Sequence, residues 1–277
     1  MILTCLPALP LRPYVRYYYQ VEEQLLVGSQ LQPVPARSLQ IIEFMFGTPY
    51  RVQRIASGEI EDAQAVAIVG AQTHRRVNLM LGGSISAFTI AFEPGGCLAL
   101  FSVPADELTN ADFDATTVLG HALAGLHERL GEVDAFEART LVMDKFLCER
   151  LPASASGSPA VWAAHELRRT NGGERVRDLA AAAALSVRQF ERRFSREIGM
   201  SPKVYARVVR FEAALRLKAA QPKTQWTEIA HRLGYFDQMH MVHDFNRLSG
   251  ESPSAVWDQL DMFVEPELRT RGAPDTY

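Results

Sequence analysis

The densest group of side chains able to do chemistry lies in residues 187–196, which carry four arginines and one glutamate. A guanidinium group donates paired hydrogen bonds to phosphate or to guanine O6 and N7, and a carboxylate accepts one from cytosine N4. Phe190 and Phe194 are four residues apart, so in a helix they share an inward face. The residues left on the outer faces are Arg188, Arg192, Arg193 and Arg196. The segment offers a basic surface to a nucleic acid, although a merely solvated helix face has the same composition.

The charge of the 277-residue chain is unevenly distributed. Its formal net charge of −3 gives no sign of a nucleic-acid partner. Residues 175–223 nevertheless carry 12 basic and 4 acidic side chains, whereas residues 224–262 carry two arginines and six acids. A basic stretch inside an acidic protein is a localised electrostatic footprint for an anionic partner.

One spacing of apolar and small residues occurs twice in the last third of the chain. Leu179-Ala180 is followed by Phe190, Phe194, Gly199, Pro202 and Tyr205, and Ile229-Ala230 is followed by Met241, Phe245, Gly250, Pro253 and Val256. From Phe190 and from Met241 onward the offsets are the same: 4, 5, 3 and 3 residues. The second copy has one extra residue between its two helices. We interpret each copy as a helix-turn-helix unit.

Capping residues mark where the second helix of each unit begins. Ser186 and Asp237 stand directly before these helices, and their side chains can accept hydrogen bonds from the first turn. In the second unit Met241 and Phe245 are expected to face inward. The residues available for its outer face are Gln238, His240 and His243. The second unit therefore offers amide and imidazole groups where the first offers arginines.

A single long helix is expected between the two units. Pro202 is well placed to open it, and the apolar stripe runs on towards Ala220. Such a rod is roughly 26 Å long at about 1.5 Å per residue. It can hold two recognition helices on one face of DNA, in major-groove segments about one turn, or roughly 34 Å, apart.

The matches to a known family extend over about residues 160–260. They are Leu179-Ala180, Ser186, Phe190, Arg193-Phe194, Gly199-Met200-Ser201-Pro202, Tyr205, Arg210, Ala214, Leu217, Ile229-Ala230, Gly234-Tyr235, Asp237-Gln238, Phe245, Gly250 and Ser252-Pro253. This region resembles the C-terminal DNA-binding domain of the AraC family of transcription regulators. The resemblance implies double-stranded DNA and RNA polymerase as partners and the bacterial cytoplasm or nucleoid as location. It also implies an N-terminal cupin-like module that binds a small-molecule effector or forms a homodimer.

The resemblance assigns DNA-contacting positions in both units. In the first unit Arg188, Glu191 and Arg192 match the family's base-reading positions, while Arg193 and Arg196 suit phosphates or internal acids. The full set of expected DNA contacts is Arg188, Gln189, Glu191, Arg192, Arg193, Arg196, Gln238, Met239, His240 and His243. The alternative is that one or two of the arginines form structural ion pairs.

Two departures from the family pattern concern the second unit. Met241 stands where the family usually has phenylalanine and can still fill the core, and His243 stands where it usually has arginine. We therefore expect the first unit to dominate affinity. The second should contribute more at low pH, where its histidines become charged.

Six strand-like segments at short spacing occupy the first 92 residues. They are residues 14–21, 39–46, 50–55, 65–69, 76–81 and 85–92, with turn signals such as Gly82-Gly83 between them. Residues 118–130 and 136–147 then carry apolar residues at helical spacing. The sequence predicts an α+β fold of two domains. The first is a mostly antiparallel β barrel, cupin-like, with a helical pair, and the second is an all-α double helix-turn-helix domain.

Small residues between Pro152 and Pro159 are typical of a linker. We therefore expect an effector-binding or dimerisation domain at 1–151, a linker at 152–159, a DNA-binding domain at 160–262 and a poorly ordered tail at 263–277. Residues 116–150 either form a dimer seam, as in the family, or pack within one chain.

Aromatic residues of the first domain could line an effector cavity, although such residues more often fill a core. The candidates are Tyr17, Tyr19, Phe44, Phe46, Phe88 and Phe92, with His74 and Arg76 suited to an anionic effector. No metal is expected, because His74 stands without clustered histidine or carboxylate partners. No other cofactor is expected either.

Other functions fit the sequence less well. A DNA-repair enzyme with an appended DNA-binding domain would need a reactive cysteine in a dedicated motif, and Cys97 has no histidine or glutamate arranged around it. No nucleophile with its base is visible, so no enzyme is expected. The two prolines within residues 1–11 argue against a signal peptide, and no apolar run reaches the roughly 18 residues of a membrane span. A regulator without an effector, controlled by a protein partner, remains an alternative.

Overall fold

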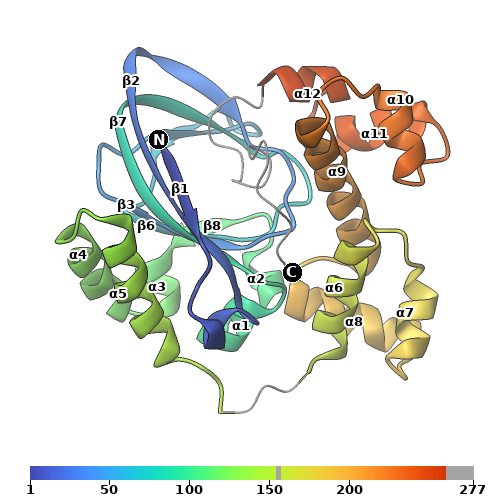
Figure 1. Ribbon diagram of the computed structural model, residues 1–277, viewed down its shortest axis with the longest axis horizontal. Helices are drawn as coiled ribbons and strands as arrows, with labels where there is room; N and C mark the ends of the chain where they lie inside the picture. Colours follow the sequence, from blue (N-terminus) through green and yellow to red (C-terminus); the bar gives the residue numbers. More distant parts are fainter. Residues whose placement is uncertain (154–156, 260–277) are drawn as a thin grey trace.

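The computed structural model of the protein describes residues 1–153 and 157–259, with the side chains of 26–29 excepted. A sheet with short helices forms the N-terminal part, and helices alone form the C-terminal part (Figure 1). This confirms the predicted α+β class with an all-α second half. The centre of the predicted linker and the predicted tail at 263–277 lie outside the described residues.

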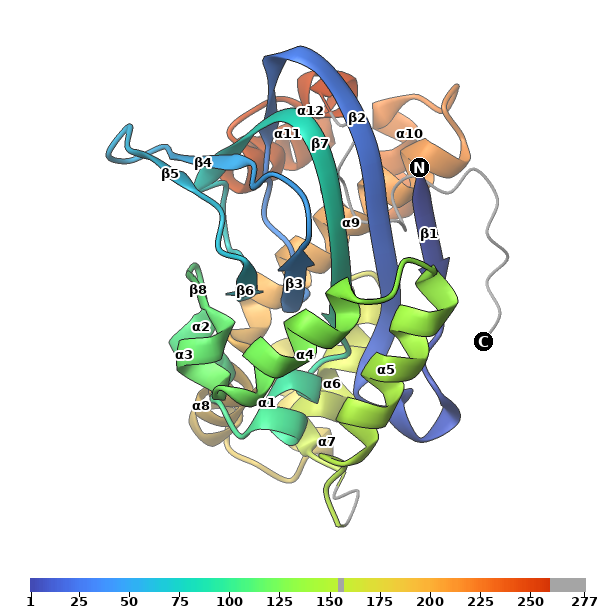
Figure 2. The same cartoon turned by 90° about the vertical axis from the view of Figure 1, so that its left-hand side faces the viewer.

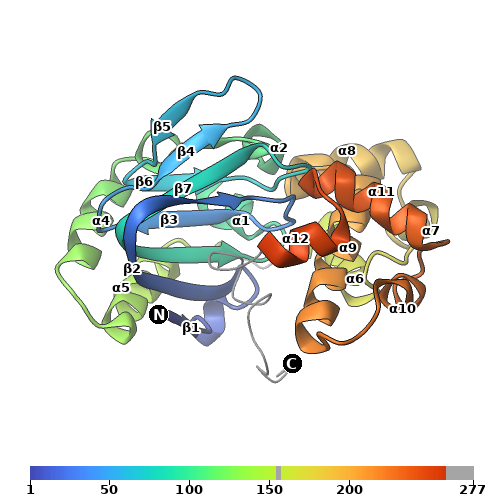
Figure 3. The ribbon, with the colours of Figure 1, turned by 90° about the horizontal axis from the view of Figure 1, so that it is seen from above.

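The N-terminal part is built on one eight-stranded antiparallel sheet. Six strands follow the order β1-β2-β7-β3-β6-β8, and β4 pairs with β5 and β7. The strands are β1 (Ile2–Cys5), β2 (Val15–Pro33), β3 (Ile41–Met45), β4 (Arg51–Arg54), β5 (Ile60–Asp62), β6 (Val66–Val69), β7 (Val77–Phe92) and β8 (Asp112–Asp114). Within the described chain β1 and β8 form opposite, unjoined edges, so the sheet curls without closing into the expected barrel (Figure 3).

The two strands predicted at residues 76–81 and 85–92 form the single strand β7. The break expected at Gly82-Gly83 is absent, because β7 runs through both glycines and pairs with β2 along almost its whole length. Gly83 adopts a φ of +75° next to a shift in the β2–β7 register, a conformation that glycine tolerates without strain. The strand β1 and the short strands β5 and β8 were not predicted.

The expected helical pair packs on its own sheet. Helices α4 (Ala122–Gly131) and α5 (Phe136–Cys148) cover one sheet face (Figure 2). Leu123, Leu126 and Leu130 of α4 are at most 1% exposed and join the core beneath it. The shorter helices of this part are the 3-10 helix η1 (Leu9–Leu11), α1 (Gly96–Phe101), α2 (Ala105–Leu108) and α3 (Ala115–Leu119). The dimer seam over residues 116–150 stays a prediction.

The C-terminal part contains the two predicted helix-turn-helix units. Its helices are α6 (Pro159–Arg169), α7 (Val176–Ala182), α8 (Val187–Ile198), α9 (Pro202–Ala220), α10 (Trp226–Arg232), α11 (Gln238–Ser249) and α12 (Pro253–Gln259). The long helix α9 has the predicted bounds and Pro202 in its first turn. It separates the unit α7–α8 from the unit α10–α11 (Figure 1).

The N-terminal part contacts both units near the C-terminal ends of their outer helices. The Thr109 hydroxyl donates to the backbone oxygen of Gly199, directly after α8. The Ala36 backbone N–H donates to Leu248 O near the end of α11, at 2.9 Å. Between these contacts, Ser38 binds the buried Glu212 carboxylate of α9 through its N–H (2.6 Å) and its hydroxyl (2.8 Å). The domain boundaries 1–151, 152–159 and 160–262 stay predictions.

Candidate nucleic-acid interface

Local hydrogen bonds and two buried rings fix the first outer helix, α8. The Ser186 hydroxyl accepts from the Gln189 N–H, and the Gln189 side chain accepts from the Ser186 N–H, which forms a capping box. Phe190 and Phe194 are fully buried, and Phe194 meets the Tyr205 ring edge-on at 5.5 Å. With one face anchored in this way, the opposite face of α8 is held rigidly towards solvent.

The arginines of α8 are exposed, as expected from the spacing, and they differ in their partners. Arg193 pairs with Glu197 four residues on, at 2.7 Å. The Glu197 carboxylate also accepts a hydrogen bond from Ser158, the cap of α6. Arg188, Arg192 and Arg196 make no ion pair with any described residue. Of the four arginines predicted to contact DNA, Arg193 is therefore held by an internal acid, and the other three remain available for an anionic partner.

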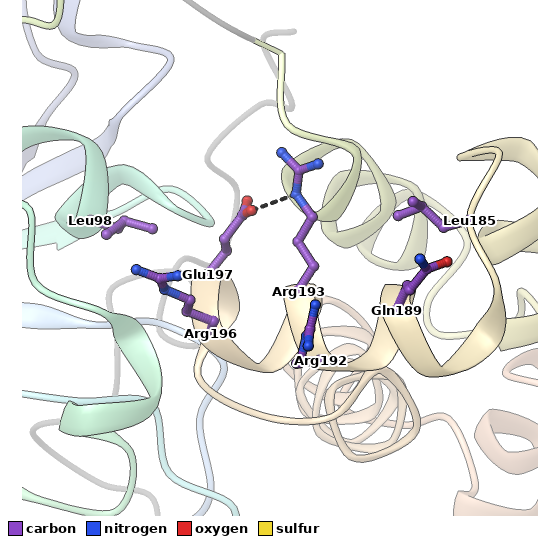
Figure 4. A pocket seen from close by; sticks show the side chains of 7 residues that line it. All are labelled: Leu98, Leu185, Gln189, Arg192, Arg193, Arg196 and Glu197. Atoms are coloured by element: carbon purple, nitrogen blue, oxygen red, sulfur yellow. Dashed lines mark hydrogen bonds and ion pairs between the residues drawn. The ribbon is translucent and has the colours of Figure 1, made fainter.

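A half-open groove of about 700 Å³ runs beside α8 (Figure 4). Its lining residues are Leu98, Leu185, Gln189, Arg192, Arg193, Arg196 and Glu197. Arg196 extends towards Leu98, which belongs to α1 of the N-terminal part (Figure 4). Leu98 was not predicted from the sequence, because a contact between residues so far apart in the chain leaves no local pattern.

The second outer helix, α11, repeats the scaffold of the first. Asp237 accepts from the His240 N–H at 2.7 Å, as predicted for its cap. Met241 and Phe245 are fully buried. The predicted contacts are all exposed; they are Gln238, Met239, His240 and His243.

Several acidic side chains of the second unit are engaged in ion pairs or a helix cap. Asp244 is 3% exposed and pairs with Arg207 of α9 at 3.1 Å. The Asp237 carboxylate is occupied by the helix cap, and Glu228 pairs with Arg232. Glu251 lies 3.9 Å from Arg75, so four acids of this unit are engaged within the protein. The weaker contribution expected of this unit rests on the lack of arginine at the four predicted contact positions of α11.

The eight residues proposed to line an effector cavity do not converge. Tyr17 and Tyr19 lie on one sheet face with Ile41 and Ala91. Phe44, Phe46 and Phe88 lie on the opposite face, under α4 and α5, and Phe92 lies on that face against Phe101 of α1. His74 and Arg76 lie in the connection between β6 and β7, where His74 is exposed. The set splits because side chains alternate between faces along a strand, and the strand register decides which face each one joins.

A half-buried polar group, which was not predicted from the sequence, lies on the face of Tyr17 and Tyr19. Glu43 lies in the same cross-strand row as Thr89 and Tyr19. Its carboxylate accepts a hydrogen bond from the Tyr50 hydroxyl, and burial raises the pKa of Glu43. Arg37 Nε and Gln40 Nε2 are buried and have no hydrogen-bond partner among the described residues. Through Arg37, whose charge acts on Glu43, this face combines aromatic rings with an unsatisfied donor.

Two further findings concern only residues 1–153 and 157–259. None of these helices is long and apolar enough to cross a membrane. No three His, Cys, Asp or Glu side chains there cluster in a way that could hold a metal ion. Cys97 is fully buried, and burial raises the pKa of its thiol to about 12. A thiolate nucleophile is therefore disfavoured at Cys97.

Two family models match the chain in separate regions. Residues 179–259 match a helix-turn-helix domain, and residues 3–114 match a domain of unknown function (DUF6597). The HTH-type transcriptional regulator Rv1931c of Mycobacterium tuberculosis is 38% identical over 85 residues, which are 31% of this chain. The aligned part spans about a third of that relative's length, 32%.

Solved structures of ToxT from Vibrio cholerae resemble almost the whole chain. An apo ToxT variant from strain SCE256 gives a TM-score of 0.53 at 11% identity and covers 88% of this chain and 98% of its own. ToxT with a bound unsaturated fatty acid gives a TM-score of 0.50 at 10% identity. This match covers 94% of this chain and 95% of the ToxT chain. At these identities the likeness concerns the fold. The chain thus carries a helix-turn-helix domain in its C-terminal part, joined to a sheet domain in a two-part fold similar to that of ToxT.

Proposed function

We propose that this protein is a sequence-specific, DNA-binding transcription regulator. The observation that carries the proposal is α8, whose buried phenylalanines hold Arg188, Arg192 and Arg196 at the surface without ion-pair partners among the described residues. Exposed, unneutralised guanidinium groups on a rigid helix suit the phosphates and guanine edges of a major groove. The helix-turn-helix match supports the same conclusion.

Each side chain of α8 has a distinct role in this proposal. Arg188 and Arg192 bind guanine, Glu191 accepts from cytosine, and Arg196 binds phosphate. Gln189 is engaged in the capping box and Arg193 with Glu197, so these two residues mainly orient the helix. In the second unit Gln238, Met239, His240 and His243 contact DNA. The 19-residue helix α9, about 28 Å long at 1.5 Å per residue, spaces the two units.

A small molecule bound at the N-terminal sheet controls DNA binding in this proposal. The supporting observation is the face that holds Tyr17, Tyr19 and Glu43, with the buried, unpaired Nε of Arg37 close to the Glu43 carboxylate. Arg37 and Ser38 are neighbours, and Ser38 binds Glu212 of α9. A ligand that binds Arg37 therefore acts one residue away from the contact between the two parts. A compound that raises the melting temperature and also changes DNA affinity would support this control.

Control by a protein partner, without any effector, is the alternative form of the same function. The partners in either form include RNA polymerase and a second copy of the chain, and the site of action is the bacterial cytoplasm. A DNA-repair enzyme is disfavoured by the buried, protonated Cys97 thiol. Transfer of a labelled alkyl group from DNA to Cys97 of this protein would contradict the assignment.

Selection of bound fragments from random duplex DNA tests the proposal. The full-length protein should enrich one motif with two parts about one helical turn apart. Arg188→Ala should keep most of the motif and lose preference at one base pair. Arg169→Ala is the matched control, since this exposed arginine pairs with Glu166 on α6 and should leave the motif unchanged. Failure of the wild-type protein to enrich any motif would refute the proposed function.

A further inference from the structure

Phe236 is the most exposed large apolar side chain among the described residues. It is 92% exposed, although it stands between the buried Tyr235 and Asp237, the cap of α11. No aromatic or cation–π contact to another described residue involves its ring. The folded protein thus holds a phenyl ring in water at the start of the second outer helix.

The internal repeat shows that Phe236 is an insertion. The N–H groups of Leu185 and Tyr235 donate to Ala180 O and Ala230 O respectively, both at 3.0 Å, so these residues are equivalent in the two units. Leu185 is followed at once by the cap Ser186, whereas Phe236 separates Tyr235 from its cap. The extra residue of the second unit is therefore Phe236. It closes no gap in the core and points its whole side chain outward.

A second apolar side chain lies in the first turn of the same helix. Met239 is 71% exposed and occupies the position that Arg188 has in the first unit. Its neighbours Gln238 and His240 are also exposed. At the point where the first unit presents a guanidinium group to DNA, the second presents a thioether, and a phenyl ring precedes it.

Thymine is the base whose major-groove edge matches this chemistry. Its C5-methyl group is the apolar feature of that groove, and apolar side chains contact it directly. The first-turn residues of a recognition helix are those that face base edges. We propose that Phe236 and Met239 select thymine by packing against its methyl groups, so that the two units read different base pairs. This inference rests on the proposed function.

A protein partner fits these two side chains less well. Phe236 and Met239 are the only large apolar residues with high exposure in the described part of the second unit, residues 224–259. Protein-binding patches are contiguous apolar areas of several hundred Å². An isolated pair flanked by amide, imidazole and carboxylate groups is too small for such a patch, whereas contact with one or two methyl groups needs no more.

Replacing thymine by deoxyuracil in the selected duplex tests the inference. The substitution removes only the methyl group and leaves base pairing unchanged. Wild-type protein should lose about fourfold in affinity at a contacted thymine in the second half of the motif, the value for one buried methyl group. Phe236→Ala and Met239→Ala should each bind the thymine duplex more weakly, and at least one should lose the preference for thymine over uracil.

Matched controls separate this inference from the proposed function. Leu141→Ala removes an apolar side chain that is 70% exposed on α5 and should change neither affinity nor thymine preference. Equal wild-type affinity for every thymine and uracil duplex would overturn the inference and leave the proposed function intact. So would variants that retain the full thymine preference, or that lose self-association instead of DNA affinity. If wild-type protein binds no selected site, the proposed function fails and the inference fails with it.

Discussion

The two helix-turn-helix units share an interior and differ in what they present to the outside. Phe190 and Phe194 anchor α8, and Met241 and Phe245 anchor α11 at the same spacing. Both helices begin at a side-chain cap and end at a glycine with positive φ. The outward positions diverge from arginine to methionine and histidine. A fold repeated within one chain can therefore keep its packing while its two surfaces acquire different partners.

The ion pairs of the two units show the same division. Arg193 pairs with Glu197 within α8, and 46% of the arginine side chain is exposed. At the equivalent position of α11, Asp244 is buried and pairs with Arg207 of α9. The first pair orients a surface side chain, whereas the second joins two helices. A charge at one repeat position thus forms a surface pair within one helix in the first unit and a buried pair between two helices in the second.

The largest effect is expected from removing the shared anchors. Phe194→Ala and Phe245→Ala should each lower the free energy of unfolding by about 3–5 kcal/mol, because both rings are fully buried and leave a cavity. Denaturant unfolding of the full chain measures both values. A loss below about 1 kcal/mol for only one of them would show that the two interiors are not equivalent.

The recognition surfaces should respond unequally. Arg192→Ala should cost about 1–3 kcal/mol of DNA-binding free energy, since it removes a guanidinium contact. His243→Ala, at the equivalent position of α11, should cost only about 0.5–1 kcal/mol, the value of one neutral hydrogen bond. Fluorescence anisotropy on the selected duplex compares them. A larger loss for the histidine variant would reverse the order of the two units.

Removing the two ion pairs should lower the free energy of unfolding by different amounts. Asp244→Ala leaves Arg207 without its carboxylate partner and should lower the free energy of unfolding by about 1–3 kcal/mol. Arg193→Ala should lower it by only about 0.3–0.5 kcal/mol, as expected for an exposed pair within one helix. Thermal unfolding of both variants provides the measurement. Equal losses would remove the distinction drawn between these pairs.

The sequence was most informative where structure depends on neighbouring residues. Caps at Ser186 and Asp237 and the proline that opens α9 are local features, and all three are confirmed. The inward phenylalanines follow from helical periodicity. Phe236 was also within reach, because the repeat contains one extra residue at this place.

Features that depend on the pairing of distant segments were not predictable. Which sheet face Tyr17 and Phe44 join is set by strand register, and a shift of one residue would exchange them. The sheet's open edges depend on β1 and β8, which are too short to give a clear pattern. The contact of Thr109 with Gly199 joins residues that lie 90 positions apart.

The contacts of Thr109 and Ala36 have a consequence for the spacing between the two halves of a DNA site. They support the turns after α8 and near the end of α11, and α9 supports both helices from within. The loops that carry these contacts are themselves tied together, since Arg37 bonds to Gln72 and the Asn110 N–H bonds to Ala71 O. Three supports, namely Thr109, Ala36 and α9, therefore fix the distance between the two outer helices. The whole chain, and not only its helical half, thus sets the spacing between the two outer helices, and with it the spacing between the two halves of a binding site.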